Sequence, residues 1–233
     1  MSQTGFWHDP AVAEAYARLA ASPDDAWYER EVNRPSIAGL IPADARPILD
    51  VGCGPGLSTA KLAETFPDVE GTDESEAMLA VARRLHPDLH FSLWQANPEP
   101  SEMNKYGAAV CARVIECIQE DEELAVFLGG LRQRLRPGGT LVVSTHHPVQ
   151  SARATQNYAE TAPYQTADPK YGIAPRLVHR SLETLVGAFK AAGFVLSLIT
   201  EPQPTDEQLA RHATGPNLFA TPQRLNMRFQ KPN

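Results

Sequence analysis

One short run of residues constrains the fold of this chain more than any other, because an apolar strand passes directly into three closely spaced glycines. Residues 48–51 have the apolar character of a buried strand and include one carboxylate, Asp50. Gly52, Gly54 and Gly56 follow at alternate positions. Glycine tolerates left-handed backbone angles and lets a ligand come close to the main chain. The run therefore predicts a strand followed by a turn that contacts a ligand.

The residues that follow the glycines extend this arrangement. Residues 57–66 carry apolar side chains at three-residue steps, which predicts a helix, and residues 69–73 predict a second strand that ends in Asp73. The spacing G-x-G-x-G differs from the G-x-G-x-x-G of dinucleotide-binding turns. Two strand-end carboxylates beside such a turn favour a nucleoside with a cationic group, and Asp73 is placed to accept hydrogen bonds from ribose hydroxyls.

In these residues the chain resembles the class I S-adenosylmethionine-dependent methyltransferases, specifically the small-molecule branch. The run from Asp50 to Gly56 is similar to the first motif of that family, Asp73 to its second-strand acid, and residues 136–140 to the turn that enters its fifth strand. The resemblance implies an α/β, Rossmann-like fold with seven mostly parallel strands in the order 3-2-1-4-5-7-6 and helices on both faces. It also implies the cofactor S-adenosyl-L-methionine and the product S-adenosyl-L-homocysteine.

Composition narrows the class of protein further. A chain of 233 residues fits one domain, and 42% apolar with 21% charged residues is ordinary for a soluble protein. No apolar run approaches a membrane span, and the N-terminus has no secretory pattern, so we expect a cytoplasmic protein. The net charge of −7 without a dense basic run disfavours nucleic acid as a partner and favours a small-molecule acceptor. Three cysteines without a C-x-x-C pair indicate neither a disulfide framework nor a zinc site. The sequence leaves a monomer and a homodimer equally open.

The remaining periodicities continue the alternation of strands and helices. We expect helices within 12–40, broken near 22–24, and at 75–85, 121–135 and 181–192, and strands at 90–94, 108–112, 140–144, 194–200 and 224–230. Residues 148–178 lose periodicity and are rich in tyrosine, proline and glycine, which predicts a substrate lid without regular structure. The single domain thus divides into a helical cap (1–42), a cofactor-binding core (43–147), the lid (148–178) and a C-terminal helix with a strand hairpin (179–233).

The resemblance assigns contacts to the ribose and methionyl parts of the cofactor. Gly52, Gly54 and Gly56 would pass the backbone beneath them, and Asp73 would accept both ribose hydroxyls. Asp50 would hold the methionine ammonium, directly or through water.

Further cofactor contacts are expected after the third and fourth strands and on the first helix. Gln95 stands where the family often has an acid that reads the adenine amino group, with the Ala96 amide placed for a ring nitrogen and Asn97 as the alternative alignment. Arg113 lies near the methionyl end, where it either binds a carboxylate or is solvated. Tyr16 resembles a cofactor-facing tyrosine, although an aromatic on a helix is more often a packing residue.

Candidate catalytic and acceptor-binding residues come from the cleft edge. His146 and His147 directly follow the fifth strand and His179 follows the lid, and a neutral histidine can take a proton from a hydroxyl, phenol or amine. A carboxylate, Glu116, could bind an amine, although an acid at the start of a surface turn is more often solvated. Aromatic side chains that could enclose an apolar acceptor, or pack in the core instead, are Trp27, Tyr28, Tyr158, Tyr164 and Tyr171.

The sequence therefore predicts methyl transfer from S-adenosylmethionine to O, N or C of a small molecule, such as a secondary metabolite. A nicotinamide-dependent oxidoreductase is the first alternative, since it shares the strand, glycine turn and second-strand acid. The second alternative is a non-catalytic protein that binds the cofactor with the same fold. Binding measurements with each cofactor distinguish the methyltransferase from the oxidoreductase, and a transfer assay distinguishes it from the non-catalytic binding protein.

Overall fold

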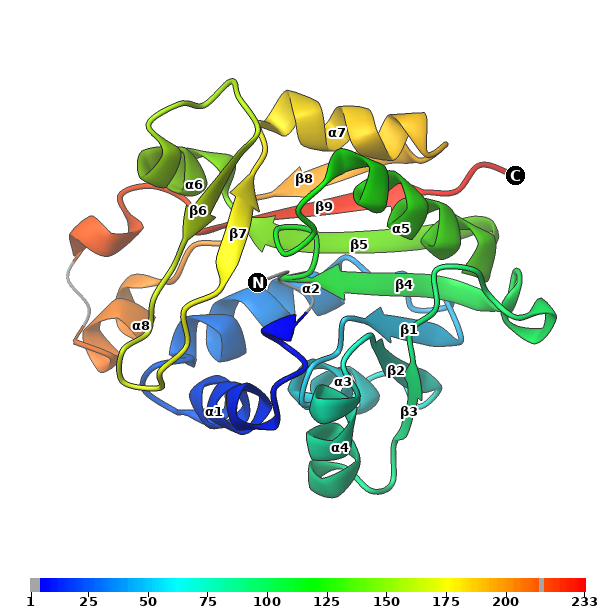
Figure 1. Ribbon diagram of the computed structural model, residues 1–233, viewed down its shortest axis with the longest axis horizontal. Coiled ribbons are helices and arrows are strands. Elements are labelled where there is room, and N and C mark those ends of the chain that lie inside the picture. The colour runs from blue at the N-terminus through cyan, green and yellow to red at the C-terminus, as the bar shows by residue number, and fades with distance from the viewer. Residues whose placement is uncertain (1–4, 214–215) are drawn as a thin grey trace.

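A seven-stranded mixed sheet forms the centre of the protein in the computed structural model, which describes residues 5–213 and 216–233 (Figure 1). Its strands are β1 (Ile48–Val51), β2 (Val69–Asp73), β3 (His90–Leu93), β4 (Tyr106–Ala112), β5 (Leu135–His146), β8 (Val195–Thr200) and β9 (Arg224–Gln230). They lie in the order β3-β2-β1-β4-β5-β9-β8, and only β9 runs antiparallel to its neighbours. Because β8 and β9 are the sixth and seventh strands of the sheet along the chain, this order confirms the predicted one.

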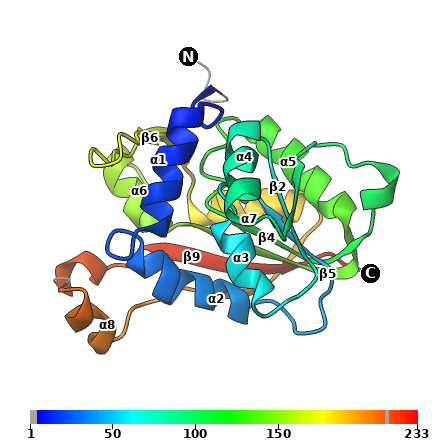
Figure 2. The same ribbon diagram turned by 90° about the horizontal axis from the view of Figure 1, so that it is seen from below.

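Helices cover both faces of the sheet. One face carries α5 (Asp121–Arg134) and α7 (Leu182–Ala191), and the other carries α2 (Arg34–Gly39) and α3 (Leu57–Ala63) (Figures 1 and 2). The helix α4 (Glu76–Leu85) begins after Ser75, whose hydroxyl accepts the Met78 N–H at 3.1 Å as an N-cap. Within the described ranges, no helix is long and apolar enough to cross a membrane.

The core follows from the two-residue period of the central strands. In β4, Ala108 and Val110 pack against α2 and α3, whereas Ala109 and Cys111 pack against α5 and α7. All four side chains are buried, as expected for a parallel strand covered on both faces. Because β1 to β5 pair in parallel, their carboxyl ends lie at one edge of the sheet, where the sequence places its glycines and acids.

The N-terminal cap forms the helices that its pattern predicted. The first helix is α1 (Pro10–Ala21), with Asp9 as its N-cap, and a π-helical turn η2 (Glu29–Asn33) leads directly into α2. The chain breaks between α1 and η2, around Pro23, as predicted. Helix α1 packs against α4 through Ala13, Ala17 and Met78.

The predicted lid is more regular than its sequence indicates, so the expectation of an irregular segment is wrong. It contains α6 (Pro148–Thr155) and a separate antiparallel pair, β6 (Ala162–Gln165) with β7 (Arg176–His179). Each of these two strands has only four residues, which is too short for a periodic pattern to be detected in the sequence. The segment between β8 and β9 likewise contains a short helix, α8 (Asp206–Arg211), and a 3₁₀ turn, η4 (Pro216–Phe219).

Candidate active site

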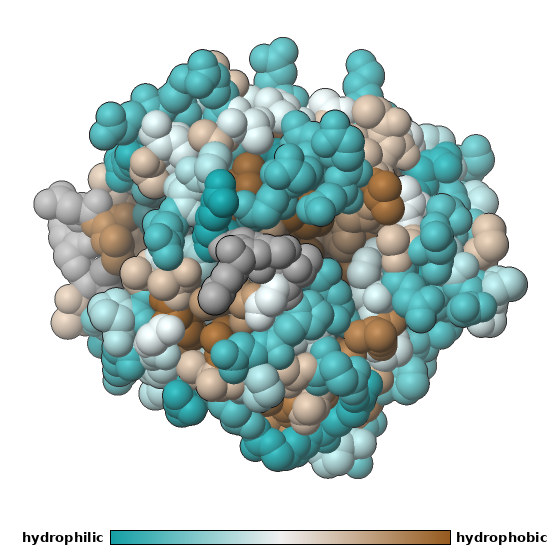
Figure 3. Space-filling view, viewed as in Figure 1, coloured by the Kyte–Doolittle hydropathy of each residue, from teal (hydrophilic) through white to brown (hydrophobic). Residues whose placement is uncertain are grey.

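A cleft of about 1050 Å³ lies at the carboxyl ends of the parallel strands. Its walls come from the glycine turn after β1, the tips of β2 and β4, the start of α5, the N-terminal segment and the β6–β7 pair. Figure 3 shows apolar side chains within a depression on this side of the molecule, bordered by hydrophilic ones. A volume at the upper end of the range for ligand sites has room for a nucleoside together with a second small molecule.

The three glycines of the turn all adopt left-handed backbone angles, but two of them line the cleft and the third faces the core. Gly52 (φ +69°) and Gly54 (φ +54°) line the cleft. A Cβ at Gly52 would collide with the Val114 side chain, whereas one at Gly54 would meet only Tyr16, at 3.7 Å. Gly56 (φ +82°) faces the core instead, where a Cβ would stand 2.9 Å from Phe91. The turn therefore presents bare main chain to the cleft at Gly52 and Gly54, and Gly56 shapes its exit into α3.

Asp73 at the end of β2 lines the cleft and is held rigidly by the main chain. Its two oxygens accept one backbone N–H each, from Gly54 at 2.8 Å and from Ser75 at 2.9 Å. A carboxylate has about four lone-pair positions, so two remain for a ligand's hydroxyls. Burial raises the pKa of Asp73 to about 6, against the opposing effect of these two N–H donors.

Asp50 lies beneath the turn and does not line the cleft. Its carboxylate is buried and accepts the Thr59 hydroxyl at 2.7 Å. Burial raises the pKa of Asp50 to about 6, and the charge of Asp73 adds to that rise. Asp50 is thus positioned to act on a ligand's ammonium through its charge or through water.

The N-terminal segment supplies an aromatic wall next to the glycine turn. Tyr16 lines the cleft and packs edge-on against Trp7 at 5.4 Å between ring centroids. The Trp7 carbonyl accepts the Ser75 hydroxyl at 2.7 Å, which ties this segment to the start of α4. The indole Nε1 of Trp7 is buried without a hydrogen-bond partner among the described residues. Sequence reasoning found Tyr16 and missed Trp7, whose position just before the N-cap of α1 was the available signal.

Of the residues that the sequence predicts near an adenine ring, the structure places one in the cleft wall. Ala96 lines the cleft, whereas Gln95 and Asn97 are exposed and do not line it. The Gln95 carbonyl accepts Arg134 Nη2 at 2.7 Å. Trp94 also lines the cleft, with the Arg134 guanidinium 4.1 Å above its ring, and the sequence reasoning did not single it out.

Arg113, directly after β4, joins an alternating chain of charges at the base of the cleft. It has a left-handed φ of +65°, and its Nε donates to Glu116 at 2.8 Å. Its Nη1 lies 3.7 Å from Glu29, which accepts Arg224 Nε at 2.6 Å. Burial alone would raise the pKa of Glu29, but Arg224 and Arg113 lower it to about 2. The structure thus connects Arg113 and Glu116 to each other and to the N-terminal cap.

The three candidate catalytic histidines lie in different surroundings. His147 is the N-cap of α6 and its Nε2 is 2.8 Å from Glu201, whereas His179 is buried between the Ser151 hydroxyl and the Tyr158 carbonyl. His146 is paired through Nδ1 with the Tyr164 hydroxyl at 2.7 Å.

None of the three histidines lines the cleft, but His146 lies close to a charged residue, Arg113, that does. Burial, followed by the positive charges of Arg113 and Arg224, holds its pKa well below the ordinary value. The imidazole is therefore neutral near pH 7.

Most of the aromatic residues proposed for the acceptor lie outside the cleft walls. Trp27 stacks on His212 at 4.4 Å, and the Tyr28 hydroxyl donates to the Pro202 carbonyl. Tyr158 is exposed beside α7, and Tyr171 donates to Asp25. Tyr164 alone of this group lies next to the cleft, because its strand neighbours Ala162 and Pro163 line it.

The chemistry of the cleft fits an adenosyl sulfonium. Bare main chain at Gly52 and Gly54 admits close approach, and Asp73 offers acceptors for vicinal hydroxyls. The negative charges of Asp50 and Asp73 suit a cation. The Gly54 N–H already donates to Asp73, so it is not free for the phosphate of a dinucleotide.

Comparison with known proteins points to the same kind of site. A family model described as a methyltransferase domain matches residues 48–139. Trans-aconitate 2-methyltransferase of Variovorax paradoxus is 33% identical over 151 residues, which are 57% of this chain and 55% of that protein. O-methyltransferase cnsE of Penicillium expansum is 30% identical over 207 residues, which are 84% of this chain and 66% of that protein. The chain spans just over half the length of the first curated relatives it matches.

Solved structures share the fold over most of the chain. A putative S-adenosylmethionine-dependent methyltransferase from Listeria monocytogenes superimposes with a TM-score of 0.68 at 20% identity, covering 85% of this chain and 96% of that one. The [4+2]-cyclase SpnF superimposes with a TM-score of 0.69 at 18% identity, covering 100% and 97%. Identities this low show the fold alone, and the reaction must be argued from the residues of the cleft.

Proposed function

The chain belongs to the class I S-adenosylmethionine-dependent methyltransferases, and from that premise we propose that it transfers a methyl group to an oxygen, nitrogen or carbon atom of a small molecule. The observation that carries the proposal is the contact between the Gly54 N–H and the Asp73 carboxylate at 2.8 Å. It joins the first and second strand tips into one cradle of bare main chain and negative charge. A cationic nucleoside matches that cradle, and a pyrophosphate does not.

Each cleft residue then has a part in holding the two substrates. Asp73 accepts the ribose hydroxyls, Gly52 and Gly54 give close approach, and Ala96 offers its amide to the adenine. Tyr16 and Trp7 cover the opposite side, where the buried Trp7 N–H gains an acceptor. When bound, S-adenosylmethionine supplies an electrophilic methyl group, and alignment of the acceptor accounts for most of the rate.

We place oxygen first among the acceptor atoms to test, because one relative is named an O-methyltransferase. We include trans-aconitate among the acceptors to test because three of the first curated relatives carry that name. A secondary metabolite with a hydroxyl is the other acceptor class. We also propose a cytoplasmic location and no nucleic-acid partner, as the composition of the sequence indicates. The oligomeric state to test is a monomer or a homodimer.

The test combines calorimetry with a transfer assay. We expect the ligand-free protein to bind S-adenosylmethionine and S-adenosylhomocysteine, and to transfer a labelled methyl group to a member of a panel that includes trans-aconitate, phenols and amines. No affinity for either nucleoside would overturn the proposal, and affinity for a nicotinamide dinucleotide instead would establish the oxidoreductase. Tight nucleoside binding without transfer to any acceptor would identify the non-catalytic binding protein.

A further inference from the structure

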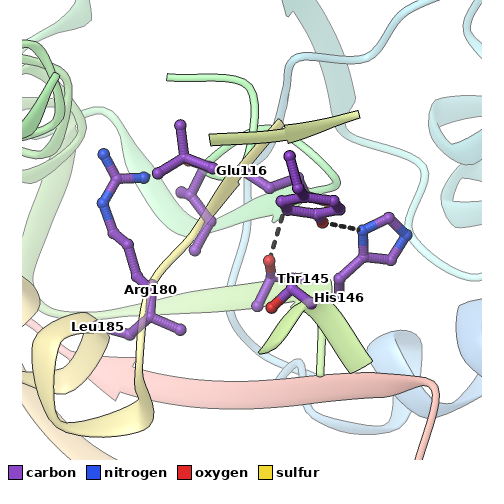
Figure 4. A pocket seen from close by; sticks show the side chains of 9 residues that line it. Glu116, Thr145, His146, Arg180 and Leu185 are labelled. Carbon is purple, nitrogen blue, oxygen red and sulfur yellow. Dashed lines mark hydrogen bonds between the residues drawn. The ribbon is translucent and has the colours of Figure 1, made fainter. Parts of the chain in front are cut away.

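A small polar chamber lies behind the wall of the cleft, and none of the functions above uses it. Val178 lines both spaces. The chamber measures about 10 Å³, which is the space that one water molecule needs. Figure 4 shows Glu116, Thr145 and Arg180 around it, with His146 at its side. The complete lining is Ile115, Glu116, Thr145, His146, Ser151, Tyr164, Val178, Arg180 and Leu185.

Most polar groups of the chamber are already committed to protein partners. Arg180 donates to Asp121 and to the carbonyls of Ile115 and Ile118, at 2.9 to 3.1 Å. The Ser151 hydroxyl pairs with His179 at 2.6 Å. These groups therefore shape the chamber and leave few positions free inside it.

Glu116 keeps accepting capacity. One carboxylate oxygen accepts Arg113 Nε at 2.8 Å and the other accepts the Thr145 hydroxyl at 2.9 Å. Two hydrogen bonds occupy about half of the lone-pair positions of a carboxylate. A buried, negatively charged acceptor thus stands beside the Tyr164 end of the chamber.

The contact between Tyr164 and His146 allows two arrangements of protons. In one, the phenol donates to Nδ1, and Nε2 carries the imidazole hydrogen. In the other, Nδ1–H donates to the phenol oxygen, and the phenol hydrogen must find a further acceptor. Within the described residues, no side chain other than His146 bonds to the Tyr164 hydroxyl, so only a molecule in the chamber can provide that acceptor.

We propose that the chamber binds one water, which accepts the Tyr164 hydroxyl hydrogen and donates to Glu116, so that Tyr164 fixes His146 as the Nδ1–H tautomer. The hydrogen bonds then run in one direction, from imidazole to phenol to water to carboxylate, and end on a negative charge. The Nε2 lone pair is left as an acceptor.

This arrangement predicts the class of acceptor that the enzyme methylates, a step that rests on the proposed function. His146 lines the chamber and not the cleft wall, so the prediction applies to an acceptor that reaches past Arg113 to Nε2. There the bare Nε2 would receive the O–H of an alcohol or phenol or the N–H of an amine, and take its proton as the new bond forms. A carboxylate acceptor has no such proton to give up. Tyr164 is therefore a positioning residue for His146, and the expected acceptor is a hydroxyl or amine compound.

The tautomer can be measured without any acceptor or cofactor. In protein with ¹⁵N-labelled histidine, long-range ¹H–¹⁵N correlations distinguish Nδ1–H from Nε2–H, and the signals of His146 among the seven histidines are those lost in His146→Gln. We expect Nδ1–H in the wild type and a change of tautomer in Tyr164→Phe, which can neither accept nor donate. Nε2–H in the wild type, or unchanged shifts in Tyr164→Phe, would overturn the proposal.

Tyr106→Phe is the matched control. Like Tyr164→Phe, it removes one tyrosine hydroxyl. The Tyr106 hydroxyl donates to Glu70 at 2.7 Å, and Tyr106 lies at the start of β4, whereas Glu116 follows the end of that strand. The His146 signals should be unchanged in this variant. If Tyr164→Phe does not fold, the wild-type tautomer decides alone. A crystal structure adds a direct check, because water density between Tyr164 and Glu116 supports the proposal and a direct bond between their side chains contradicts it.

The acceptor class is tested once an acceptor is identified. We expect His146→Gln to lower kcat for a hydroxyl or amine acceptor by at least about 100-fold, with S-adenosylhomocysteine affinity unchanged. Tyr164→Phe should lower kcat with little change in KM. If the protein does not bind the nucleoside, the proposed function is overturned, but the measured tautomer of His146 is unaffected. Wild-type kcat in His146→Gln, with binding intact, would refute the role of His146 alone.

Discussion

At the scale of single residues, the raised pKa of Asp73 makes cofactor binding depend on pH. Its carboxyl has a pKa of about 6 in the folded protein, so it is mostly protonated at pH 5 and mostly ionised at pH 7. Only the ionised form offers full acceptor capacity and negative charge to a cationic nucleoside. We therefore expect the affinity for S-adenosylmethionine, measured by calorimetry, to rise about tenfold from pH 5 to pH 7.

Asp73→Asn supplies the control for this pH dependence. The amide has nearly the same shape and does not ionise, so the variant should bind weakly at pH 7 and lose the part of the change between pH 5 and 7 that comes from Asp73. The part that comes from Asp50, whose pKa is also about 6, should remain. A wild-type affinity that is flat across this range would show that Asp73 is not the acceptor of the ribose hydroxyls.

A second prediction at this scale concerns the two kinds of glycine in the chain. Gly52→Ala forces a left-handed alanine against Val114, so we expect a loss of about 2 to 4 kcal/mol in the free energy of unfolding and no detectable nucleoside binding. Gly129→Ala, in α5 with no atom within 4 Å of the new Cβ, should instead stabilise by about 0.5 to 1 kcal/mol. Urea denaturation of both variants measures the difference, and a well-folded Gly52→Ala protein that binds normally would contradict the strain argument.

The sequence could identify residues whose proposed role depends on nearby positions in the chain. It could not identify residues that reach the site through tertiary packing. Gly52, Gly54 and Asp73 lie within 22 positions of each other, and their roles follow from backbone geometry and strand ends. Trp7 is held at the cleft by tertiary contacts, among them the hydrogen bond from Ser75 to its carbonyl and the packing against Tyr16. Nothing local marks the pairing of Tyr164 with His146, because that contact depends on how a two-stranded lid docks beside β5.

At the scale of elements, the lid is a hairpin whose connecting segment is tied to the N-terminal cap by one carboxylate. Asp25 accepts hydrogen bonds from Ser22 within the cap and from Lys170 and Tyr171 of the lid, all at 2.6 to 2.7 Å. The Lys170 ammonium, followed by the two hydroxyls, holds the pKa of Asp25 below its usual range. The contact links two segments that both border the cleft.

We expect Asp25→Ala to release this end of the lid. Residues 166–175 should exchange amide hydrogens faster, while the melting temperature falls by no more than about 2 °C, because exposed ion pairs add little to global stability. Hydrogen exchange followed by mass spectrometry measures the exchange rates, and scanning calorimetry measures the melting temperature. Glu64→Ala, which removes an exposed ion pair with Lys61 far from the lid, is the control and should leave 166–175 unchanged.

The same scale explains why some elements were predictable and others were not. Helix α5 buries Leu124, Phe127, Leu128 and Leu131 at three- and four-residue steps, so its pattern and its packing agree. Strands β6 and β7 have four residues each, and of β6 only Tyr164 is buried. A pattern of four residues has no detectable period, and these strands become regular because β6 and β7 pair with each other.

At the scale of the whole molecule, the alternation of strands and helices predicts a parallel sheet with right-handed crossovers, whereas the strand order itself could be predicted only because the resemblance to the methyltransferase family implied it. The two strand tips that hold Gly52 and Asp73 then meet at one edge of the sheet. They come from neighbouring strands, and residues of the N-terminal segment and of segment 148–178 line the same cleft. Ligand binding should therefore stabilise the entire fold and not one segment.

This coupling gives a prediction for thermal unfolding. A ligand that binds only the folded state at 100 times its dissociation constant adds about 2.7 kcal/mol, which corresponds to a rise of about 5 to 11 °C for a domain of this size. S-adenosylhomocysteine at that ratio should produce such a shift in scanning calorimetry, in a single transition, because cap, core and lid all border the cleft. A nicotinamide dinucleotide at equal concentration should leave the melting temperature unchanged. Asp73→Asn should lose most of the shift, and two separate transitions, with only one moved by the ligand, would show that the cap or lid unfolds independently of the core.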